Sequence, residues 1–425
     1  MLAADLEVDA RRIPGLAAAQ APGFAWLDGG PGGRGLVAAW PDLEIEADDL
    51  GALSEIEARW RARPELPWIG WLTYEVGADA LRGRAGPRGR LPGLCFRRYP
   101  AALEIGPGGV IGRGEAGAVD RLRAHLEAAR PIERARWPLD ALTPTDDFAA
   151  YRQRFDRVLA AIRAGDTYQI NLSHVLEARW TATPPGSPAA LARAAAAIYA
   201  DLRGRAPAPM GALLDAGGAW ILSNSPETLI DVRLGDVAGG RDLARAWPIK
   251  GTRPRSDDPD EDRRRAAELL GSAKDRAEHL MIVDLLRNDL GRLAAPGSVA
   301  APRIPELVAL PTVHHLVSEV RCALSPGWSL AALIDAVFPG GSITGAPKRR
   351  TIELIAAIED HARGIYCGAI LALGPGGLRA SIPIRTAILD RSGLSLCSGG
   401  GLVADSDPED EWRETLVKAR AFAGG

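Results

Sequence analysis

Helical segments with clear caps alternate with strand-like apolar runs from Asp147 to the end of the chain, and this mixture constrains the fold most. Residues 147–165 place apolar side chains at helical spacing and stop at Gly165, whereas residues 168–180 have the pattern of a strand. Ser187 then predicts the N-cap of another helix. Because helices and strands follow no strict βαβ period, the sequence predicts an α+β fold with helices covering large sheets.

The remaining segments fit the same fold class. Residues 256–291 predict two helices broken near Gly271, and Asp407 predicts the cap of a last helix. Three further strands are expected, in residues 365–373, 381–389 and 394–399.

The first part of the chain has a different pattern of apolar and turn-forming residues. Residues 1–140 alternate short apolar runs, among them PWIGWLTYEVGA, with Gly- and Pro-rich breaks, which is typical of strands joined by turns. Helices are expected near Ser54–Arg63 and Val119–Arg130, and Pro131–Asp147 resembles a connector. We therefore expect an N-terminal part, 1–140, and a catalytic region, 147–425, within one compact unit.

Composition excludes several classes of protein. The 425 residues contain 51 Lys and Arg against 54 Asp and Glu, and a net charge of −3 argues against nucleic-acid binding through a basic face. No run approaches the ~18 apolar residues of a membrane span, and the acidic N-terminus lacks a signal pattern, so a cytoplasmic location is expected. The four cysteines are widely separated without a C-x-x-C pair, which predicts buried reduced thiols.

Lysine is scarce. Only four basic residues are lysines: Lys250, Lys274, Lys348 and Lys418. Arginine carries surface charge equally well, so a retained lysine can indicate a need for a primary amine that loses its proton and attacks carbon. For any single lysine, chance retention is an equal alternative.

Two of the expected helices carry carboxylates that could bind a cation. Glu278 lies near the start of EHLMIVDLLRNDLG, and Glu411, Glu414 and Lys418 share one stripe of the last helix. Magnesium accepts one or two carboxylates together with substrate oxygens and water. From spacing alone, a solvated charged face is the favoured alternative.

Glycine-rich segments and isolated polar residues are weaker signals. The segment FPGGSITGAPK leads into a helix and favours an anion, but it lacks the Lys-Ser/Thr pair of a nucleotide loop. Gly399–Gly401 permit close approach of a ligand, although a plain turn is the commoner explanation. Taken singly, Glu227, Lys250 and His315 favour structural roles by about two to one.

Taken in order, however, these segments resemble the chorismate-utilising enzymes, a family of anthranilate, aminodeoxychorismate, isochorismate and salicylate synthases. The resemblance runs from Phe148 to Phe422. It is carried by GDTYQINLS, SPETLI, PIKGTRPR, EHLMIVDLLRNDLGR, TVHHLVSEV, FPGGSITGAPK, YCGAI, IRTAI and GGGLVADSDPEDEWRETLVKA. It implies two large, packed, mainly antiparallel sheets with helices outside, as in anthranilate synthase component I, and a site in a cleft.

The resemblance also implies a set of site residues. Mg²⁺ is expected on Glu278 and Glu414, with Glu411 nearby, and the catalytic positions correspond to Lys250, Glu227 and His315. The substrate-binding positions correspond to Gln169, Thr252, Ser342, Thr344, Tyr366, Arg385, Gly399, Gly400, Gly401 and Lys418. An arginine fork and backbone N–H groups suit the carboxylates of chorismate.

Three positions distinguish the branches of this family. Gln169 stands where the isochorismate and salicylate branch uses a lysine to activate water, and glutamine is no base. Lys250 in PIKGT is typical of aminodeoxychorismate synthases, whereas anthranilate synthases resemble PIAGT. We expect neutral Lys250 to add to C2 of chorismate while Glu227 protonates the departing C4 hydroxyl, after which ammonia attacks C4 and expels the lysine.

A partner and two alternatives complete the prediction. No cysteine sits in the turn of an amidotransferase nucleophile, so a glutamine amidotransferase subunit is expected to supply ammonia. The product would be 4-amino-4-deoxychorismate, for p-aminobenzoate and folate synthesis. The alternatives are anthranilate synthase component I, with Lys250 an atypical substitution, and a non-catalytic chorismate-binding subunit.

Overall fold

The computed structural model describes residues 11–19, 21–132, 136–237, 239–302, 304–309 and 313–424. The acidic N-terminal stretch, part of the expected connector and Thr312 of the TVHHLVSEV motif lie outside these residues. None of the described helices has both the length and the apolar character that a membrane crossing requires.

An 11-stranded sheet forms the larger layer, and all its pairs are antiparallel. In spatial order its strands are β18 (Gly345–Ala346), β9 (Gln169–Ala178), β22 (Gly393–Leu402), β21 (Thr386–Asp390), β11 (Trp220–Ser225), β10 (Met210–Asp215), β1 (Ala25–Asp28), β2 (Gly35–Ala38), β6 (Ala101–Gly106) and β7 (Gly109–Gly114), with β8 (Thr143–Pro144) beside β9.

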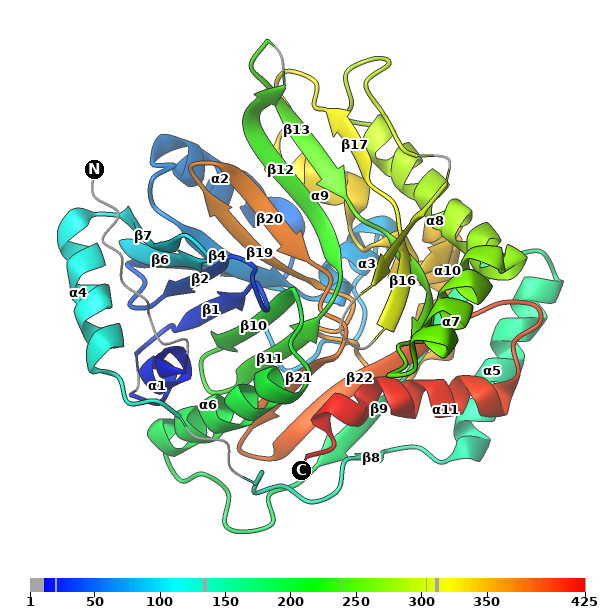
Figure 1. Cartoon of the computed structure of the whole chain (residues 1–425), viewed down its shortest axis with the longest axis horizontal. Helices are drawn as coiled ribbons and strands as arrows, with labels where there is room; N and C mark the ends of the chain where they lie inside the picture. The colour runs from blue at the N-terminus through cyan, green and yellow to red at the C-terminus, as the bar shows by residue number, and fades with distance from the viewer. Residues whose placement is uncertain are drawn as a thin grey trace.

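A second, eight-stranded sheet packs against the first, and a three-stranded sheet stands apart (Figure 1). The second sheet runs β17 (Val320–Ala323), β13 (Arg241–Ala246), β12 (Thr228–Val237), β20 (Gly377–Ser381), β19 (Ala369–Gly374), β4 (Trp68–Leu72), β5 (Leu94–Arg98) and β3 (Leu43–Ala47). The small sheet contains β14 (Ile249–Pro254), β16 (Val313–Val317) and β15 (Glu306–Ala309). Both large sheets draw strands from the first 140 residues and from the region after residue 147.

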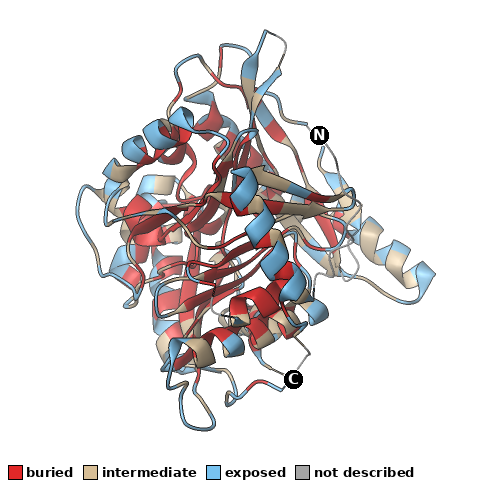
Figure 2. Cartoon of the chain, turned by 90° about the vertical axis from the view of Figure 1, so that its left-hand side faces the viewer, coloured by how far each residue is buried: buried red, intermediate tan, exposed pale blue. Residues whose placement is uncertain are grey.

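Helices cover the outside of the sheets. They are α1 (Arg12–Ala18), α2 (Leu53–Ala62), α3 (Tyr74–Arg82), α4 (Ala116–Ala128), α5 (Phe148–Arg163), α6 (Pro188–Arg205), α7 (Pro259–Gly271), α8 (Ala273–Gly291), α9 (Leu330–Val337), α10 (Lys348–Ile358) and α11 (Pro408–Ala419), with 3-10 turns at Leu50–Ala52, Gly341–Ile343 and Arg420–Phe422. Figure 2 shows that the strands are mostly buried and that exposed residues lie on helices and loops.

Strand alternation builds the core in layers. In β1, Ala25 packs between the two large sheets, whereas Trp26 packs on the outer face with residues of α1, α4 and α6. In β4, Ile69 likewise faces the first sheet while Trp68 faces the helices beneath the second. Successive side chains of a strand point to opposite faces, so each sheet is buried on both sides.

The expected α+β fold with two large antiparallel sheets is confirmed. The predicted caps are present: Ser187 accepts from the backbone of α6, and Asp407 accepts from the first turn of α11. One expectation was wrong, because PWIGWLTYEVGA is not a continuous strand. The strand ends at Leu72, and a helix begins at Tyr74 and ends against Gly83, which has a left-handed conformation.

Candidate active site

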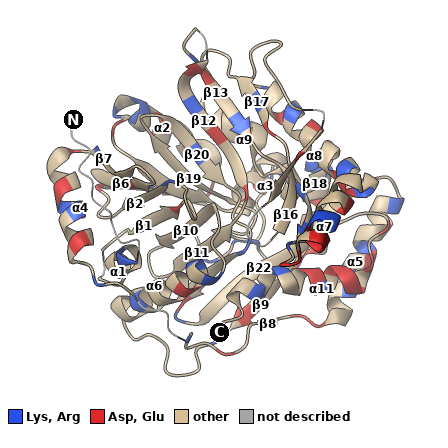
Figure 3. Ribbon diagram, in the orientation of Figure 1, with Lys and Arg blue, Asp and Glu red and all other residues tan. Residues whose placement is uncertain are grey.

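The expected site residues come from elements far apart in the sequence. Strands β9 and β22 pair with each other, α11 packs on β22, and α7 and α8 pack on β14 of the small sheet. Figure 3 shows acidic and basic residues gathered on α5, α7 and α11 around this region. The small sheet contributes Lys250 and His315, whereas the large sheet contributes Gln169 and the triple glycine.

Lys250 and Glu227 interact electrostatically. Burial lowers the pKa of the Lys250 ammonium below its ordinary value, although the carboxylates of Glu227 and Glu278 act in the opposite direction. Burial raises the pKa of Glu227, which is 7% exposed, while Ser342, Lys250 and Arg385 oppose that shift. Desolvation thus brings the pKa values of the amine and the acid closer together, because it favours the neutral form of each group.

The segment after cis-Pro339 positions the acid. Ser342 Oγ donates to Glu227 Oε1 at 2.7 Å, and the fully buried Thr344 donates to the carbonyl of Gly340 at 3.0 Å. The Thr344 carbonyl accepts from the backbone N–H of Asn171 at 2.9 Å, which joins this segment to β9.

Arg385 lies near the same acid, and His315 lies near Arg385. His315 Nδ1 is 2.9 Å from Thr252 Oγ1, and burial, assisted by the Arg385 charge, lowers the pKa of His315. Arg385 is exposed and has φ of 50°, a conformation that is uncommon for a residue with a side chain. The charge of Glu227 acts on Arg385, so these groups share one environment.

The triple glycine lies in a strand, which corrects the simple-turn alternative. Gly399, Gly400 and Gly401 pair with Ser173, Leu172 and Asn171 of β9. A methyl group on Gly399 would lie 2.6 Å from the Leu172 carbonyl oxygen and 2.8 Å from the Tyr366 hydroxyl. Position 399 therefore requires glycine because the backbone of the neighbouring strand approaches it closely.

Gln169 and Tyr366 flank this strand. A methyl group on Gly401 would lie 2.3 Å from Gln169 Nε2, and the Gln169 amide, 1% exposed, has neither hydrogen-bond donor nor acceptor among the described residues. The Tyr366 hydroxyl lies 3.4 Å from the amide nitrogen of Asn171. An unpartnered buried amide at this position is available to a ligand.

The expected metal ligands are only partly gathered. Burial and the neighbouring Glu414 raise the pKa of Glu411, which accepts from Ser406 Oγ at 2.6 Å. Lys418 Nζ lies 2.7 Å from Glu414 Oε1 and donates to the Gly399 carbonyl at 3.0 Å. Within the described chain, the carboxylates of Glu278, Glu411 and Glu414 do not form a group with oxygens all within 4.8 Å of one another.

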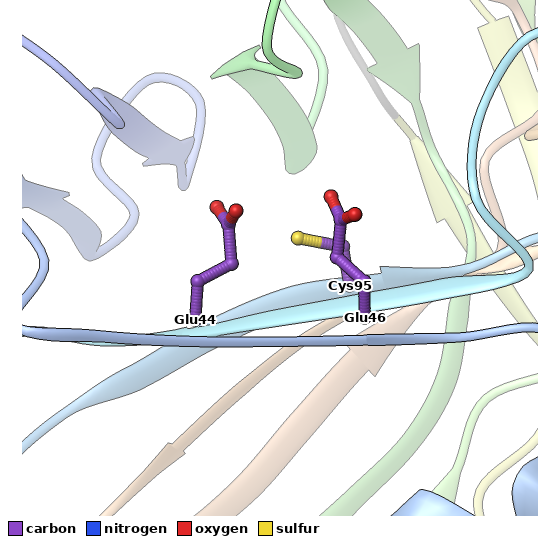
Figure 4. Close-up of side chains that lie close together, drawn as sticks. All are labelled: Glu44, Glu46 and Cys95. Atoms are coloured by element: carbon purple, nitrogen blue, oxygen red, sulfur yellow. The ribbon is translucent and has the colours of Figure 1, made fainter.

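Another acidic cluster lies away from this site. Figure 4 shows Glu44 and Glu46 of β3 close to Cys95 of β5, with potential ligand atoms within 4.8 Å of one another. Burial raises the pKa of the Cys95 thiol to about 12, and Glu44 pairs with Arg97. A protonated thiol and a neutralised carboxylate make a poor ligand set.

A cavity of about 560 Å³ also lies outside the site. It is lined by strands of the two large sheets, among them β1, β2, β10, β12 and β19, and none of the expected site residues lines it.

The sequence did not identify two buried polar residues of this region. Asn171 joins Tyr366 and Thr344, and His279, whose Nε2 is 2.7 Å from Ser318 Oγ, experiences the Lys250 charge. They lie inside the motifs GDTYQINLS and EHLMIVDLLRNDLGR, so their polarity within apolar runs was the available signal.

Among known sequences, aminodeoxychorismate synthase component 1 of Escherichia coli is 40% identical over 389 residues, covering 87% of this chain and 81% of the relative. Anthranilate synthase component 1 1 of Haloarcula marismortui is 36% identical over 433 residues, covering 93% and 85%. Four further curated relatives are 37 to 42% identical, and the chain spans 50 to 56% of their length.

The fold agrees with these relatives. The crystal structure of anthranilate synthase component I from Streptococcus pneumoniae matches with a TM-score of 0.77 at 26% identity, covering 92% of each chain. The family model described as chorismate binding enzyme matches residues 36–424. The chain therefore belongs to the chorismate binding enzyme family.

Proposed function

We propose that this protein aminates chorismate at C4 to give 4-amino-4-deoxychorismate, the reaction of aminodeoxychorismate synthase component 1. The observation that carries the proposal is the electrostatic interaction of Lys250 with Glu227, whose pKa values burial shifts in opposite directions. A neutral amine is a nucleophile and a neutral carboxyl is a proton donor, so the pair has the states that the reaction needs.

The proposed reaction has two displacements. The Lys250 nitrogen forms a bond to C2 of chorismate, the ring double bond shifts, and the C4 hydroxyl leaves as water with the proton of Glu227. Ammonia then forms a bond to C4, the double bond shifts back, and the C2–nitrogen bond breaks to release neutral Lys250. Glu227 regains its proton from the new ammonium group, so the protein returns to its starting state.

The surrounding groups have proposed binding roles. Arg385, the backbone of Gly399–Gly401 and Lys418 would bind the two carboxylates of chorismate, and the unpartnered amide of Gln169 would hydrogen-bond to the substrate or to ammonia. His315, held beside Thr252, would lie near the ring.

Magnesium is the proposed cofactor, and the donor chemistry fits it. Glu278, Glu411 and Glu414 offer hard oxygen ligands. Burial, together with repulsion from Glu414, raises the pKa of Glu411, and a divalent cation would remove that repulsion. A bound Mg²⁺ would withdraw electrons from the ring carboxylate of chorismate and favour loss of the C4 hydroxyl.

A glutamine amidotransferase subunit is the proposed source of ammonia, with free ammonium as a substitute in vitro, and the cytoplasm is the proposed location. The cysteine thiols support the need for a partner: burial raises the pKa of each one, so none of them is a ready nucleophile.

The test is an assay with chorismate, ammonium and Mg²⁺, followed by chromatography of the products. We expect 4-amino-4-deoxychorismate, converted to p-aminobenzoate when the separate lyase is added. Anthranilate and pyruvate would instead support the second candidate, anthranilate synthase, which the relative from Haloarcula marismortui favours. The Lys250→Ala variant should lose amination but retain chorismate binding.

A further inference from the structure

Arg363 and Glu359 form a buried ion pair beside the site. The guanidinium donates to the carboxylate through two nitrogens, Nε to Oε2 at 2.8 Å and Nη2 to Oε1 at 2.7 Å. The two side chains are 1% and 2% exposed. Removing such charges from water is costly, and a buried pair is therefore weak evidence for stability alone. The partners of this pair indicate a different role.

Arg363 contacts three parts of the site. Its Nη2 donates to the Asn171 carbonyl at 2.6 Å, and its Nη1 donates to the carbonyl of Ile343, the residue before Thr344, at 3.2 Å. The guanidinium also lies over the Tyr366 ring, 5.8 Å from its centroid. One planar group thus sets the distances between β9, the segment that contains Thr344, and Tyr366.

Glu359 forms hydrogen bonds to the same strand two residues further along. Its Oε1 accepts from the backbone N–H of Ser173 at 2.8 Å and from the Ser173 hydroxyl at 2.9 Å. Ser173 pairs with Gly399, and Asn171, which Arg363 holds, pairs with Gly401. The ion pair therefore anchors β9 directly opposite both ends of the triple glycine.

We propose that the Arg363–Glu359 pair is a positioning element that fixes the shape of the substrate-binding surface formed by Tyr366, Thr344 and Gly399–Gly401. This inference rests on the proposed function, because it takes chorismate to be the ligand of that surface. Neither side chain is assigned a part in the chemical steps.

The test is the Arg363→Lys substitution, with chorismate affinity measured by titration calorimetry in the presence of Mg²⁺ and in the Lys250→Ala background, which cannot form the covalent adduct; KM is measured with Lys250 intact. Lysine keeps the charge opposite Glu359, but its single ammonium cannot reproduce the fork to Asn171 and Ile343. We expect the Kd and the KM for chorismate to rise together by about tenfold, with a smaller change in kcat.

Arg97→Lys is the matched control. Arg97 is also buried, pairs with Glu44, donates to the Asp215 carbonyl and lies over a ring, that of Trp71 at 5.7 Å, but it contacts no site residue. It should lower the melting temperature while leaving the Kd for chorismate unchanged. Equal loss of stability in both variants with wild-type chorismate affinity in both would overturn the proposal.

A milder variant covers the case in which Arg363→Lys does not fold. Ser173→Ala removes one hydrogen bond to Glu359 and keeps the ion pair, and we expect about a threefold rise in the Kd. Wild-type affinity in this variant would also overturn the proposal. If the wild type binds chorismate but makes anthranilate, the proposed function fails while the role of the ion pair stands; if it binds no chorismate, both fail.

Discussion

Replacing Glu227 by glutamine tests the proposed proton donor, because glutamine keeps the shape of a protonated carboxyl and removes its acidic proton. Glu227 is 7% exposed, and burial raises its pKa. Glutamine buries no charge there, so we expect stability equal to or above that of the wild type. Loss of a general acid typically costs about 10²- to 10⁴-fold in kcat, or about 3–5 kcal/mol.

The two pKa shifts give the scale of the effect. The reaction needs protonated Glu227 together with neutral Lys250, and at ordinary pKa values of about 4.3 and 10.4 this arrangement is about 10⁶-fold rarer than the ion pair. Each unit by which the two pKa values converge makes it about tenfold more populated. Burial moves both groups in the required direction, so the structure reduces a penalty that would otherwise dominate kcat.

The assay is the pH dependence of kcat for amination. In the wild type the singly protonated pair gains a proton at low pH and loses one at high pH, so the profile is bell-shaped. In Glu227→Gln the residual rate should rise with pH and level off above the lowered pKa of Lys250.

Ser342→Ala is the matched control, because its hydrogen bond lowers the pKa of Glu227. Removing that bond should move the acid limb of the profile to higher pH without abolishing activity. A Glu227→Gln enzyme with wild-type kcat and an unchanged bell-shaped profile would show that Glu227 is not the proton donor.

Three further predictions concern packing, acid stability and metal binding. Gly399→Ala should lower the free energy of unfolding in urea by about 1–3 kcal/mol, because its methyl group would lie 2.6 Å from the Leu172 carbonyl oxygen. Gly271→Ala should not destabilise the protein, because its methyl group would meet nothing within 4 Å. Burial lowers the pKa of His174 to about 4, from about 6.5 in the unfolded chain. The free energy of unfolding should therefore fall by up to about 3 kcal/mol as the pH falls from 6.5 to about 4. The His174→Gln variant should show a weaker pH dependence. Glu278→Gln should weaken Mg²⁺ binding to the chorismate complex by at least about tenfold in titration calorimetry, and unchanged affinity would remove Glu278 from the proposed ligands.

Local signals in the sequence predicted the helices well. Ser187 and Asp407 identify helix starts because a cap satisfies backbone groups within its own turn. The break between α7 and α8 lies where Gly271 predicted it. In contrast, the helix that begins at Tyr74 was missed, since its apolar residues continue directly from those of β4 and only the tertiary contacts separate the two elements.

The sequence did not predict the pairing of strands that lie far apart in the chain. Gly399–Gly401 belong to a strand because β9, far earlier in the chain, supplies their hydrogen-bonding partners, and no local pattern records that pairing. The small sheet that holds Lys250 and His315 was likewise unforeseen. The predicted site residues came from the resemblance and stay a prediction, whereas the opposed pKa shifts and the buried ion pair of Arg363 became visible only in three dimensions.

The most direct test of the proposed mechanism is intact-protein mass spectrometry after incubation with chorismate and Mg²⁺ in the absence of ammonia. The proposed mechanism predicts a mass increase equal to chorismate less one water, located on Lys250 by peptide mapping, removed by added ammonium and absent from Lys250→Ala. An unmodified protein that nevertheless aminates chorismate at its normal rate, or an adduct on another residue, would contradict it.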